Sequence, residues 1–372
     1  MLKKVYSLVF FIKNLKMKTI YFLFSFIVMS TVVWGQNELQ LTLPPHIYCN
    51  PHAEISLYYD NVIYNPDSIQ YIFRIRRKLG IDHSDKFTFD TGRKSSCHSR
   101  FRVKVFDQFG SLVASEKSIV HFNIVKSIPA DTTKILIIGN SLTARGIYSA
   151  KVQSYLSDSL HFPVKFLGTK ASNGGIHEGY GGKTWEWLAK HGDSPFVIHT
   201  TDNDSILNFE HYFTDVIHEA PDVVVIFLGI NDCFRADATS IETIDKTIDE
   251  MLENTTFFLS RLIDNNPELQ IGVCLTPPAN DRQEAFRINY GDKYTQSGWK
   301  KIQHRLVQRY IAFFKHNFQA NCSLIPVEIN IDTYNGYPDN NGVHPNVNGY
   351  NQIAASIFNW IYSLFGNKNQ EQ

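Results

Sequence analysis

Apolar and basic residues alternate strictly along Arg100–Val105, which gives the clearest two-residue period in the first third of the chain. Such alternation predicts a strand that buries one face and exposes the other. Other short segments with strand character are separated by turn residues, and they comprise Ile55–Tyr59, Tyr71–Ile75, Ser111–Ala114 and Ile119–Val125. We therefore predict a small antiparallel β-sandwich over residues 37–128, with a structural or carbohydrate-contacting role.

After Thr133 the pattern changes to continuous apolar segments that alternate with helical periodicity. The apolar segments predict buried strands at Lys134–Ile138, Val164–Leu167, Val223–Leu228, Ile271–Leu275 and Leu324–Val327. Helices are predicted near Ile147–Ser159, Ile241–Ile263, Gly298–Phe318 and Val347–Phe365. This alternation predicts an α/β domain over residues 129–372, in which helices cover both faces of a flavodoxin-like parallel sheet in three layers. In such sheets, functional residues collect at the carboxyl ends of the strands.

The first 36 residues carry five lysines and no acidic residue, and an uncharged, mostly apolar stretch runs from Ile20 to Gly35. A basic start, an apolar centre and a small-residue end are typical of a secretory signal peptide, which we predict for residues 1–36. Met17 is an alternative start, and a retained transmembrane anchor is the competing interpretation. Cleavage of the signal leaves an exported protein, periplasmic or secreted, without stable membrane insertion.

Charge and composition narrow the classes of partner. The chain has 372 residues, 43% of them hydrophobic, which is typical of a folded globular protein. Its 36 basic and 36 acidic residues balance, and setting aside the five leader lysines leaves 31 against 36, a formal charge of −5. A mildly acidic chain has no basic excess to neutralise a phosphate backbone, so we predict no nucleic-acid partner.

Five cysteines are present, and export would permit disulfides. Cys49 and Cys97 both lie in the first region and are candidates for pairing, although sequence cannot assign the connectivity. Cys233, Cys274 and Cys322 are scattered without metal-ligand spacing, so we expect buried thiols and no metal site.

Three short motifs follow predicted strands or precede the last predicted helix. Ser141 stands in Gly-Asn-Ser-Leu directly after the first strand of the second domain, and Asn231 stands in Gly-Ile-Asn-Asp after a later strand. His344 lies in the loop before the final helix. Alone, each has an ordinary interpretation: an N-cap serine, a turn and a surface histidine.

Taken together, these motifs resemble those of the GDSL or SGNH family of serine hydrolases, in which Ser, Gly, Asn and His occur in this order. The resemblance covers about Lys134 to Phe365. It implies that Ser141 is the nucleophile and His344 its general base. It also implies an oxyanion hole formed by the backbone N–H of Ser141 together with Gly182 and Asn231.

The sequence departs from the family pattern at two positions. Asn140 replaces the Asp of Gly-Asp-Ser, which leaves the nucleophile in place. Asn341 replaces the carboxylate that usually lies three residues before the histidine. The imidazole of His344 is then oriented by Asn341, by Asp339 or by a backbone acceptor in a Ser-His dyad.

The residues around these motifs suggest a substrate. Trp185 and Tyr180 flank the Gly182 segment, and we predict that both bind substrate, together with the loop Thr276–Tyr290. Aromatic and polar side chains suit sugars, and the resemblance to exported family members implies an esterase that removes O-acetyl groups from carbohydrates without a metal or other cofactor. A lipase or lysophospholipase of the same fold and a catalytically inactive glycan-binding module are the alternatives.

Overall fold

The computed structural model describes residues 39–65, 69–93, 95–199, 204–317 and 321–368. The predicted signal peptide and the competing anchor therefore lie outside the described residues. The chain divides by its contacts into two units, and residues 41–64 and 70–372 make up the larger one. The smaller unit is residues 1–40 and 65–69, and among its described residues Asn65 Nδ2 donates a hydrogen bond to the carbonyl of Ile69. Within the described ranges, none of the helices is both long and apolar enough to cross a membrane.

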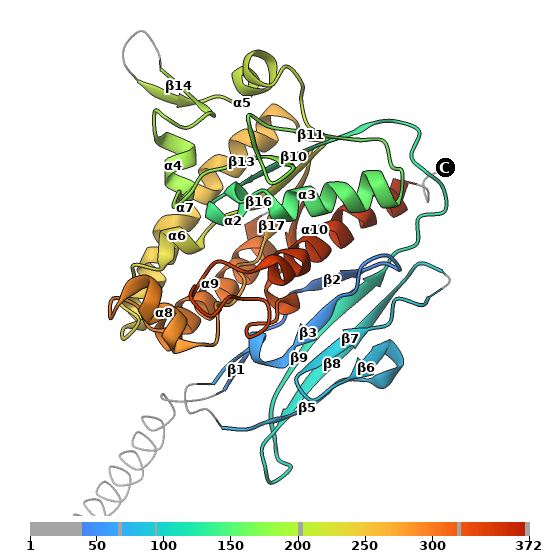
Figure 1. Ribbon diagram of the computed structural model, residues 1–372, viewed down its shortest axis with the longest axis vertical. Helices are drawn as coiled ribbons and strands as arrows, with labels where there is room; N and C mark the ends of the chain where they lie inside the picture. Colours follow the sequence, from blue (N-terminus) through green and yellow to red (C-terminus); the bar gives the residue numbers. More distant parts are fainter. Residues whose placement is uncertain (1–38, 66–68, 94, 200–203, 318–320, 369–372) are drawn as a thin grey trace, which may run out of the picture. The chain divides into compact units, whose positions relative to one another are not determined.

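A seven-stranded, mainly parallel sheet forms the centre of the α/β region (Figure 1). Strand β10 lies inside it, with β16, β17 and β18 following on one side and β11 and β13 sharing its other side. With β13 set aside, the parallel strands β11, β10, β16, β17 and β18 lie in the flavodoxin-like order 2-1-3-4-5, which confirms the predicted α/β fold class. The strands are β10 (Thr133–Gly139), β11 (Val164–Leu167), β12 (Lys170–Ser172), β13 (Gly175–Gly179), β16 (Val223–Phe227), β17 (Gln270–Cys274) and β18 (Cys322–Ile325).

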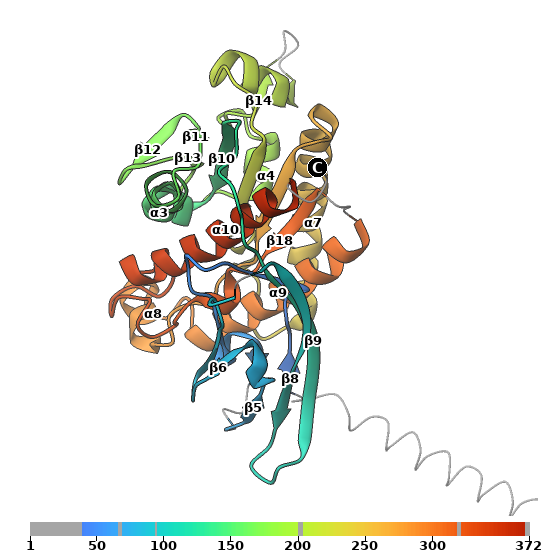
Figure 2. The ribbon, with the colours of Figure 1, turned by 90° about the vertical axis from the view of Figure 1, so that its right-hand side faces the viewer.

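Helices cover both faces of this sheet, because its strands are apolar on both sides (Figures 1 and 2). Helices α3 (Ile147–Gln153) and α10 (Val347–Lys368) pack together on one face. On the other face α7 (Ile241–Asn265) packs against α9 (Gln296–Asn317) and α4 (Trp185–Lys190). The shorter elements are α2 (Ser141–Ala144), α5 (Phe209–His211), α6 (Ile230–Cys233), α8 (Gln283–Tyr290), β14 (Val197–His199) and β15 (Ser205–Leu207).

The longest helix, α7, shows why the sequence folds this way locally. Ser240 caps its N-terminus, where the side chain accepts a hydrogen bond from the backbone N–H of Thr243. Ile244, Ile248 and Met251 then recur three and four residues apart, and all three are buried against the sheet. The helix therefore follows from a cap and a single apolar stripe.

An all-β region precedes the α/β part, as predicted. A four-stranded sheet has the order β2-β9-β8-β5, a three-stranded sheet has the order β3-β7-β6, and β1 pairs with β4. Most pairs are antiparallel, although β2 and β9 run parallel. The strands are β1 (Gln40–Leu41), β2 (His46–Cys49), β3 (Ser56–Tyr58), β4 (Ile63–Tyr64), β5 (Ile72–Arg74), β6 (Gly80–Asp82), β7 (Lys86–Phe89), β8 (Cys97–Phe106) and β9 (Leu112–Phe122).

One detail of the strand prediction is wrong. Ser111–Ala114 and Ile119–Val125 were expected as two strands, but they largely fall within the single strand β9. The intervening polar residues Glu116 and Lys117 remain paired with Val103 and Arg102 of β8. The backbone ladder therefore continues through a segment whose side chains carry no apolar signal.

Buried amides connect the two regions. Asn330 Oδ1 accepts a hydrogen bond from the backbone N–H of Ser56, and Asn330 Nδ2 donates to the carbonyl of Gln352. Asn61 Nδ2 donates to the carbonyls of Glu328 and Ile331. The boundary predicted between residues 128 and 129 falls in the connection between β9 and β10, inside a compact unit that contains both regions.

The cysteines are all free thiols. Cys49 of β2 and Cys97 of β8 lie opposite the same residue, Phe122, from the two sides of β9. Strands two apart in a sheet are separated by about 10 Å, whereas a disulfide needs Cα atoms within about 7 Å. This register does not permit the candidate pairing.

Candidate active site

Ser141 stands at the carboxyl end of β10, where the strand gives way to α2. Asn140 is the N-cap of this helix, and its Oδ1 accepts a hydrogen bond from the backbone N–H of Leu142 at 3.0 Å. An asparagine side chain can therefore serve as the cap at the position where the family has aspartate. Ser141 occupies the first helical position, where its own N–H has no acceptor within the helix.

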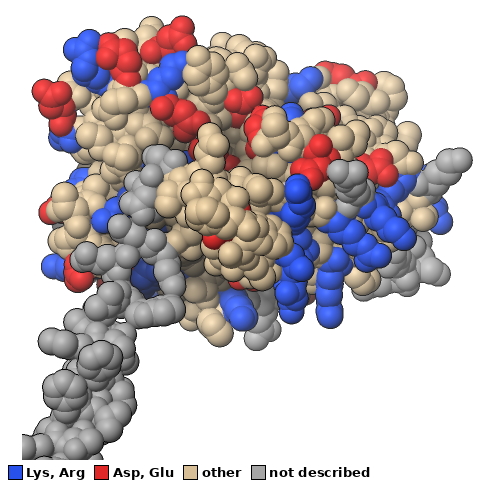
Figure 3. All heavy atoms as spheres, turned by 90° about the horizontal axis from the view of Figure 1, so that it is seen from below, with Lys and Arg blue, Asp and Glu red and all other residues tan. Residues whose placement is uncertain are grey.

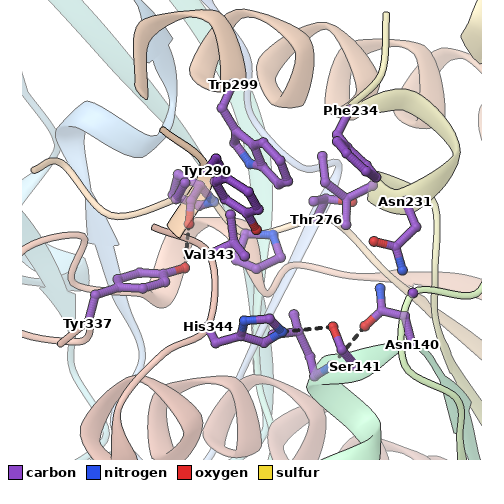
Figure 4. Close-up of a pocket in the computed structure, with 16 residues that line it drawn as sticks. Asn140, Ser141, Asn231, Phe234, Thr276, Tyr290, Trp299, Tyr337, Val343 and His344 are labelled. Carbon is purple, nitrogen blue, oxygen red and sulfur yellow. Dashed lines mark hydrogen bonds between the residues drawn. The ribbon is translucent and has the colours of Figure 1, made fainter. Parts of the chain in front are cut away.

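His344 reaches Ser141 from the other end of the chain. It lies in the loop before α10, and its Nε2 is 2.9 Å from Oγ of Ser141 (Figure 4). Asn341 Oδ1 accepts hydrogen bonds from the backbone N–H groups of Val343 and His344, at 3.1 and 2.9 Å. The asparagine thus shapes the loop that carries the imidazole, rather than contacting the ring.

Asp339, the other candidate for orienting the imidazole, points elsewhere. Its side chain is 89% exposed and forms an ion pair with Nε of Arg282 at 3.3 Å. Among the described residues, the hydrogen bonds of His344 are those to Ser141 Oγ and to Asn341 Oδ1. The structure therefore brings Ser141 and His344 together as a pair, and it places neither predicted acceptor on the ring.

The surroundings of His344 favour its neutral form. Burial lowers the pKa of the imidazole below its usual value of 6.5, and the positive charge of Arg145 lowers this pKa further. Arg145 is an exposed residue four positions after Ser141, one helical turn along α2. A neutral imidazole is the form that can accept the proton of a serine hydroxyl.

Gly182 and Asn231 lie beside Ser141, as the resemblance implied, and all three line one pocket. Gly182 has a φ of +71° and open space on the side where a Cβ would stand, so backbone there is accessible to a ligand. Asn231 Nδ2 donates to the carbonyl of Lys183 at 3.0 Å, and Figure 4 shows this nitrogen directed towards Asn140 and Ser141. An amide nitrogen carries two hydrogens, so a second N–H remains for an oxyanion.

Asp232 connects the Asn231 turn to the Gly182 segment. Its Oδ1 accepts a hydrogen bond from the backbone N–H of Trp185 at 3.1 Å, at the start of α4. Burial raises the pKa of Asp232 to about 7, partly offset by this hydrogen bond. The carboxyl is therefore a structural link between two segments of the site.

The pocket above Ser141 has a volume of about 280 Å³, which is small for a ligand site. Aromatic side chains form one wall, with Phe234 and Trp299 stacked at 5.6 Å between ring centroids. The complete lining consists of Asn140, Ser141, Leu142, Gly182, Ile230, Asn231, Phe234, Thr276, Pro277, Pro278, Ala279, Tyr290, Trp299, Tyr337, Val343 and His344. The predicted loop Thr276–Tyr290 thus contributes its first four residues and its last.

Two predicted substrate-binding residues lie elsewhere. Trp185 is completely buried, and its Nε1 donates to the hydroxyl of Tyr310 at 2.7 Å, so it is a core residue. Tyr180 is half-buried, donates its hydroxyl to Glu178 and packs against Trp187, outside the pocket. The prediction for Trp185 is wrong, because the first turn of α4 directs this ring towards α7 and α9 instead of the site.

Sequence reasoning missed two members of the aromatic wall, Phe234 and Trp299, whereas Tyr290 lies in the predicted loop. Phe234 follows the Asn231 motif by three residues, and Trp299 lies in the first turn of α9. Both lie close to the end of a predicted strand or the start of a predicted helix, and only this position in the sequence indicated that they could be near the site. The chemistry of a phenyl or indole ring does not distinguish a pocket wall from a core.

One known family matches the sequence of the α/β region. The sequence model of the family described as GDSL-like Lipase/Acylhydrolase matches residues 135–357, more than half of the chain. A comparison with curated proteins returns no match. No group of three or more described His, Cys, Asp or Glu residues is arranged to hold a metal ion.

Solved structures show similarity at low identity. A carbohydrate esterase family 3 protein from Talaromyces cellulolyticus is 18% identical, with a TM-score of 0.42 over 63% of this chain and 99% of that one. A family 3 carbohydrate esterase of Clostridium thermocellum is 17% identical, with a TM-score of 0.42 over 63% and 100%. The carbohydrate acetylesterase Est24 of Sinorhizobium meliloti is 16% identical, with a TM-score of 0.38 over 62% and 99%.

The family match spans all three motifs, from the serine after β10 to the histidine before α10. The structure brings the same motifs to one edge of the parallel sheet, around one pocket. The chain belongs to the GDSL-like lipase/acylhydrolase family and is a hydrolase of carboxylic esters.

Proposed function

We propose that this enzyme hydrolyses short-chain acyl esters, O-acetyl groups above all, on carbohydrates. The observation that carries the proposal is the Ser141–His344 pair at a small pocket, with Oγ and Nε2 at 2.9 Å. The motif at residues 1–36 further suggests that the enzyme acts outside the cytoplasm.

In the proposed reaction, His344 Nε2 takes the proton of Ser141 as Oγ attacks the ester carbonyl carbon. The negative charge that develops on the carbonyl oxygen is stabilised by the N–H groups of Ser141, Gly182 and Asn231. His344 then returns the proton to the leaving sugar hydroxyl, and the acyl group stays on Ser141. Water, activated by the same imidazole, releases the acid and restores the serine.

The shape of the pocket supports a short acyl group. A volume of about 280 Å³ and a wall that includes Phe234, Trp299 and Tyr290 leave little length for a fatty-acyl chain. The same aromatic faces, beside the polar Asn231 and Asn140, suit a sugar ring at the entrance. A long apolar groove, as a lipase or lysophospholipase needs, is not part of this pocket's lining.

The test uses residues 37–372 with p-nitrophenyl esters of increasing chain length and with acetylated xylan and pectin. We expect acetyl esters to be cleaved with the highest kcat/KM and acetate to be released from at least one polysaccharide. Faster cleavage of long-chain esters would replace the proposal with the lipase alternative. Absence of hydrolysis by the wild type, or full activity of Ser141→Ala, would refute the catalytic assignment.

A further inference from the structure

Six basic side chains lie on the outer face of the β5–β8–β9 sheet and on the residues next to it. This positive surface contrasts with the formal charge of −5 that the chain carries without the leader. All six are exposed, and none forms an ion pair with a carboxylate of the described residues. Figure 3, which views the side of the β region, shows Lys and Arg side chains gathered there. They are Arg74, Arg76, Arg100, Arg102, Lys104 and Lys117.

The strand register places like charges directly opposite each other. Arg102 of β8 faces Lys117 of β9, and Arg74 of β5 faces Lys104 of β8. Directly opposed like charges destabilise a sheet, because their side chains meet on the same face. An anionic ligand lying between them would offset this repulsion.

These cations line a groove of about 900 Å³, which we call the cationic groove. Its other lining residues are uncharged or weakly basic, and they are Pro45, His46, Ile75, Phe101, Ser118 and Ile119. Arg100, Arg102 and Lys104 occupy alternate positions on one strand, so their backbones extend over roughly 13 Å. This span exceeds a single carboxylate or sulfate and corresponds to several anionic groups in a row.

We propose that the cationic groove binds an acidic polysaccharide, a chain of sugars that carry carboxylate or sulfate groups. The inference rests on the proposed function in one respect, namely that the substrate is a glycan. The groove then holds the polymer through its charges, while the neutral pocket at Ser141 receives the ester. The enzyme would accordingly prefer esters on acidic glycans to the same esters on neutral ones.

Two other polyanions fit the lining less well. Phe101 is the only Phe, Tyr or Trp in the lining of the groove and is buried, so the groove has no exposed aromatic platform on which the bases of single-stranded nucleic acid would stack. An anionic membrane would engage exposed apolar side chains, and Phe109 and Leu112 are exposed near the end of the β8–β9 hairpin. They do not line the groove, whose concave form suits a polymer chain.

The test measures binding of the Ser141→Ala chain, residues 37–372, to de-esterified polygalacturonate by isothermal titration, so that no ester is involved. Arg100→Gln/Arg102→Gln should weaken binding at least about tenfold, and raising the salt from about 50 to about 200 mM should weaken wild-type binding. The matched control is Lys190→Gln/Lys246→Gln, which removes two exposed cations from α4 and α7 and should bind like the wild type. Melting temperatures of both double variants establish that the fold is intact.

Sulfated glycan and neutral xylan serve as further ligands, to separate sulfate from carboxylate and charge from sugar. Absence of binding to both polygalacturonate and the sulfated glycan, or equal loss of binding in the control variant, would overturn the proposal. Tighter binding to anionic vesicles or to single-stranded DNA than to either acidic glycan would also overturn it. The Arg100→Gln/Arg102→Gln enzyme should hydrolyse p-nitrophenyl acetate at the wild-type rate. A negative binding result would therefore leave the proposed esterase activity in place. Conversely, binding by the Ser141→Ala chain can be measured whether or not the wild type is an esterase.

Discussion

Oγ of Ser141 lies 2.9 Å from Nε2 of His344, although 203 residues separate them in the sequence. Ser141 directly follows β10, and His344 lies in the loop before α10, so both residues stand at the carboxyl edge of the parallel sheet. Asn341, which holds that loop, provides the positional control that an orienting carboxylate often provides.

Replacing either member of the pair should remove most of the activity. Ser141→Ala and His344→Ala are each expected to lower kcat at least about 10³-fold, because the nucleophile and its base act as a unit. Burst and steady-state kinetics with p-nitrophenyl acetate measure the loss. The double variant should be no slower than either single one, and additive losses would contradict a shared role.

Asn231→Ala tests the oxyanion hole. Loss of one donor should lower kcat by about 10²-fold or more, roughly 3 kcal/mol of transition-state stabilisation, with little change in KM. Asn140→Asp is the matched control, because a carboxylate oxygen can also accept the hydrogen bond from Leu142 and cap α2. An unchanged kcat with a raised KM for Asn231→Ala would show instead that the amide only binds substrate or only holds Lys183.

The pH profile should depend on Arg145. Activity requires neutral His344, so kcat/KM falls as the pH decreases through the pKa of its imidazole. Burial and Arg145 both lower this pKa, and Arg145→Gln removes the second cause. The acid limb of the profile should therefore move to higher pH, whereas the exposed control Lys190→Gln should leave it in place. A shift to lower pH would contradict the assignment.

Asp339 and Asn341, the two side chains that the sequence offers for orienting His344, should behave differently from a triad carboxylate. Asp339→Asn is expected to retain activity within about threefold, because Asp339 is exposed and paired with Arg282. Asn341→Ala should be more harmful, since it removes two hydrogen bonds from the loop that carries His344. A loss of about 10²-fold or more for Asp339→Asn would mean that the loop rearranges to bring this carboxylate to the ring.

Glu328 should make stability depend on pH. Its carboxyl is fully buried, no other described residue donates a hydrogen bond to either oxygen, and burial raises its pKa from 4.5 to about 8. The folded state therefore holds a proton that the unfolded state has lost, and stability decreases as the pH rises from about 4.5 through about 8.

Glu328→Gln removes this contribution, because an amide does not ionise. Urea unfolding should show that the decrease in unfolding free energy between about pH 5 and about pH 8.5 is smaller in the variant by at least about 1 kcal/mol. Equal decreases in the two proteins would show that the carboxyl of Glu328 ionises in the folded state as easily as in the unfolded state.

Elements with strong local signals could be predicted from the amino-acid sequence. The strand Val164–Leu167 was predicted with the observed bounds, and α7 was predicted within two residues, because continuous apolar runs and a capped amphipathic stripe are local patterns. Short or polar elements escaped prediction, such as the β12–β13 hairpin and α8. Their conformation depends on neighbours that a window of sequence does not contain.

Which side chains contact each other depends on the packing of the whole fold. The sequence motifs identified Ser141, Asn231 and His344 as site residues. The turn stabilised by Asn341 and the wall formed by Phe234 and Trp299 became apparent only in the folded structure. Trp185 illustrates the limit, because an aromatic residue next to a motif was placed in the core by Phe258 and Tyr310. Likewise, the alternation at Arg100–Val105 predicted a strand with an exposed basic face, whereas the opposition of Arg102 and Lys117 follows from strand register. Apolar periodicity is a short-range property, and contacts between distant residues are set by the packing of the whole chain.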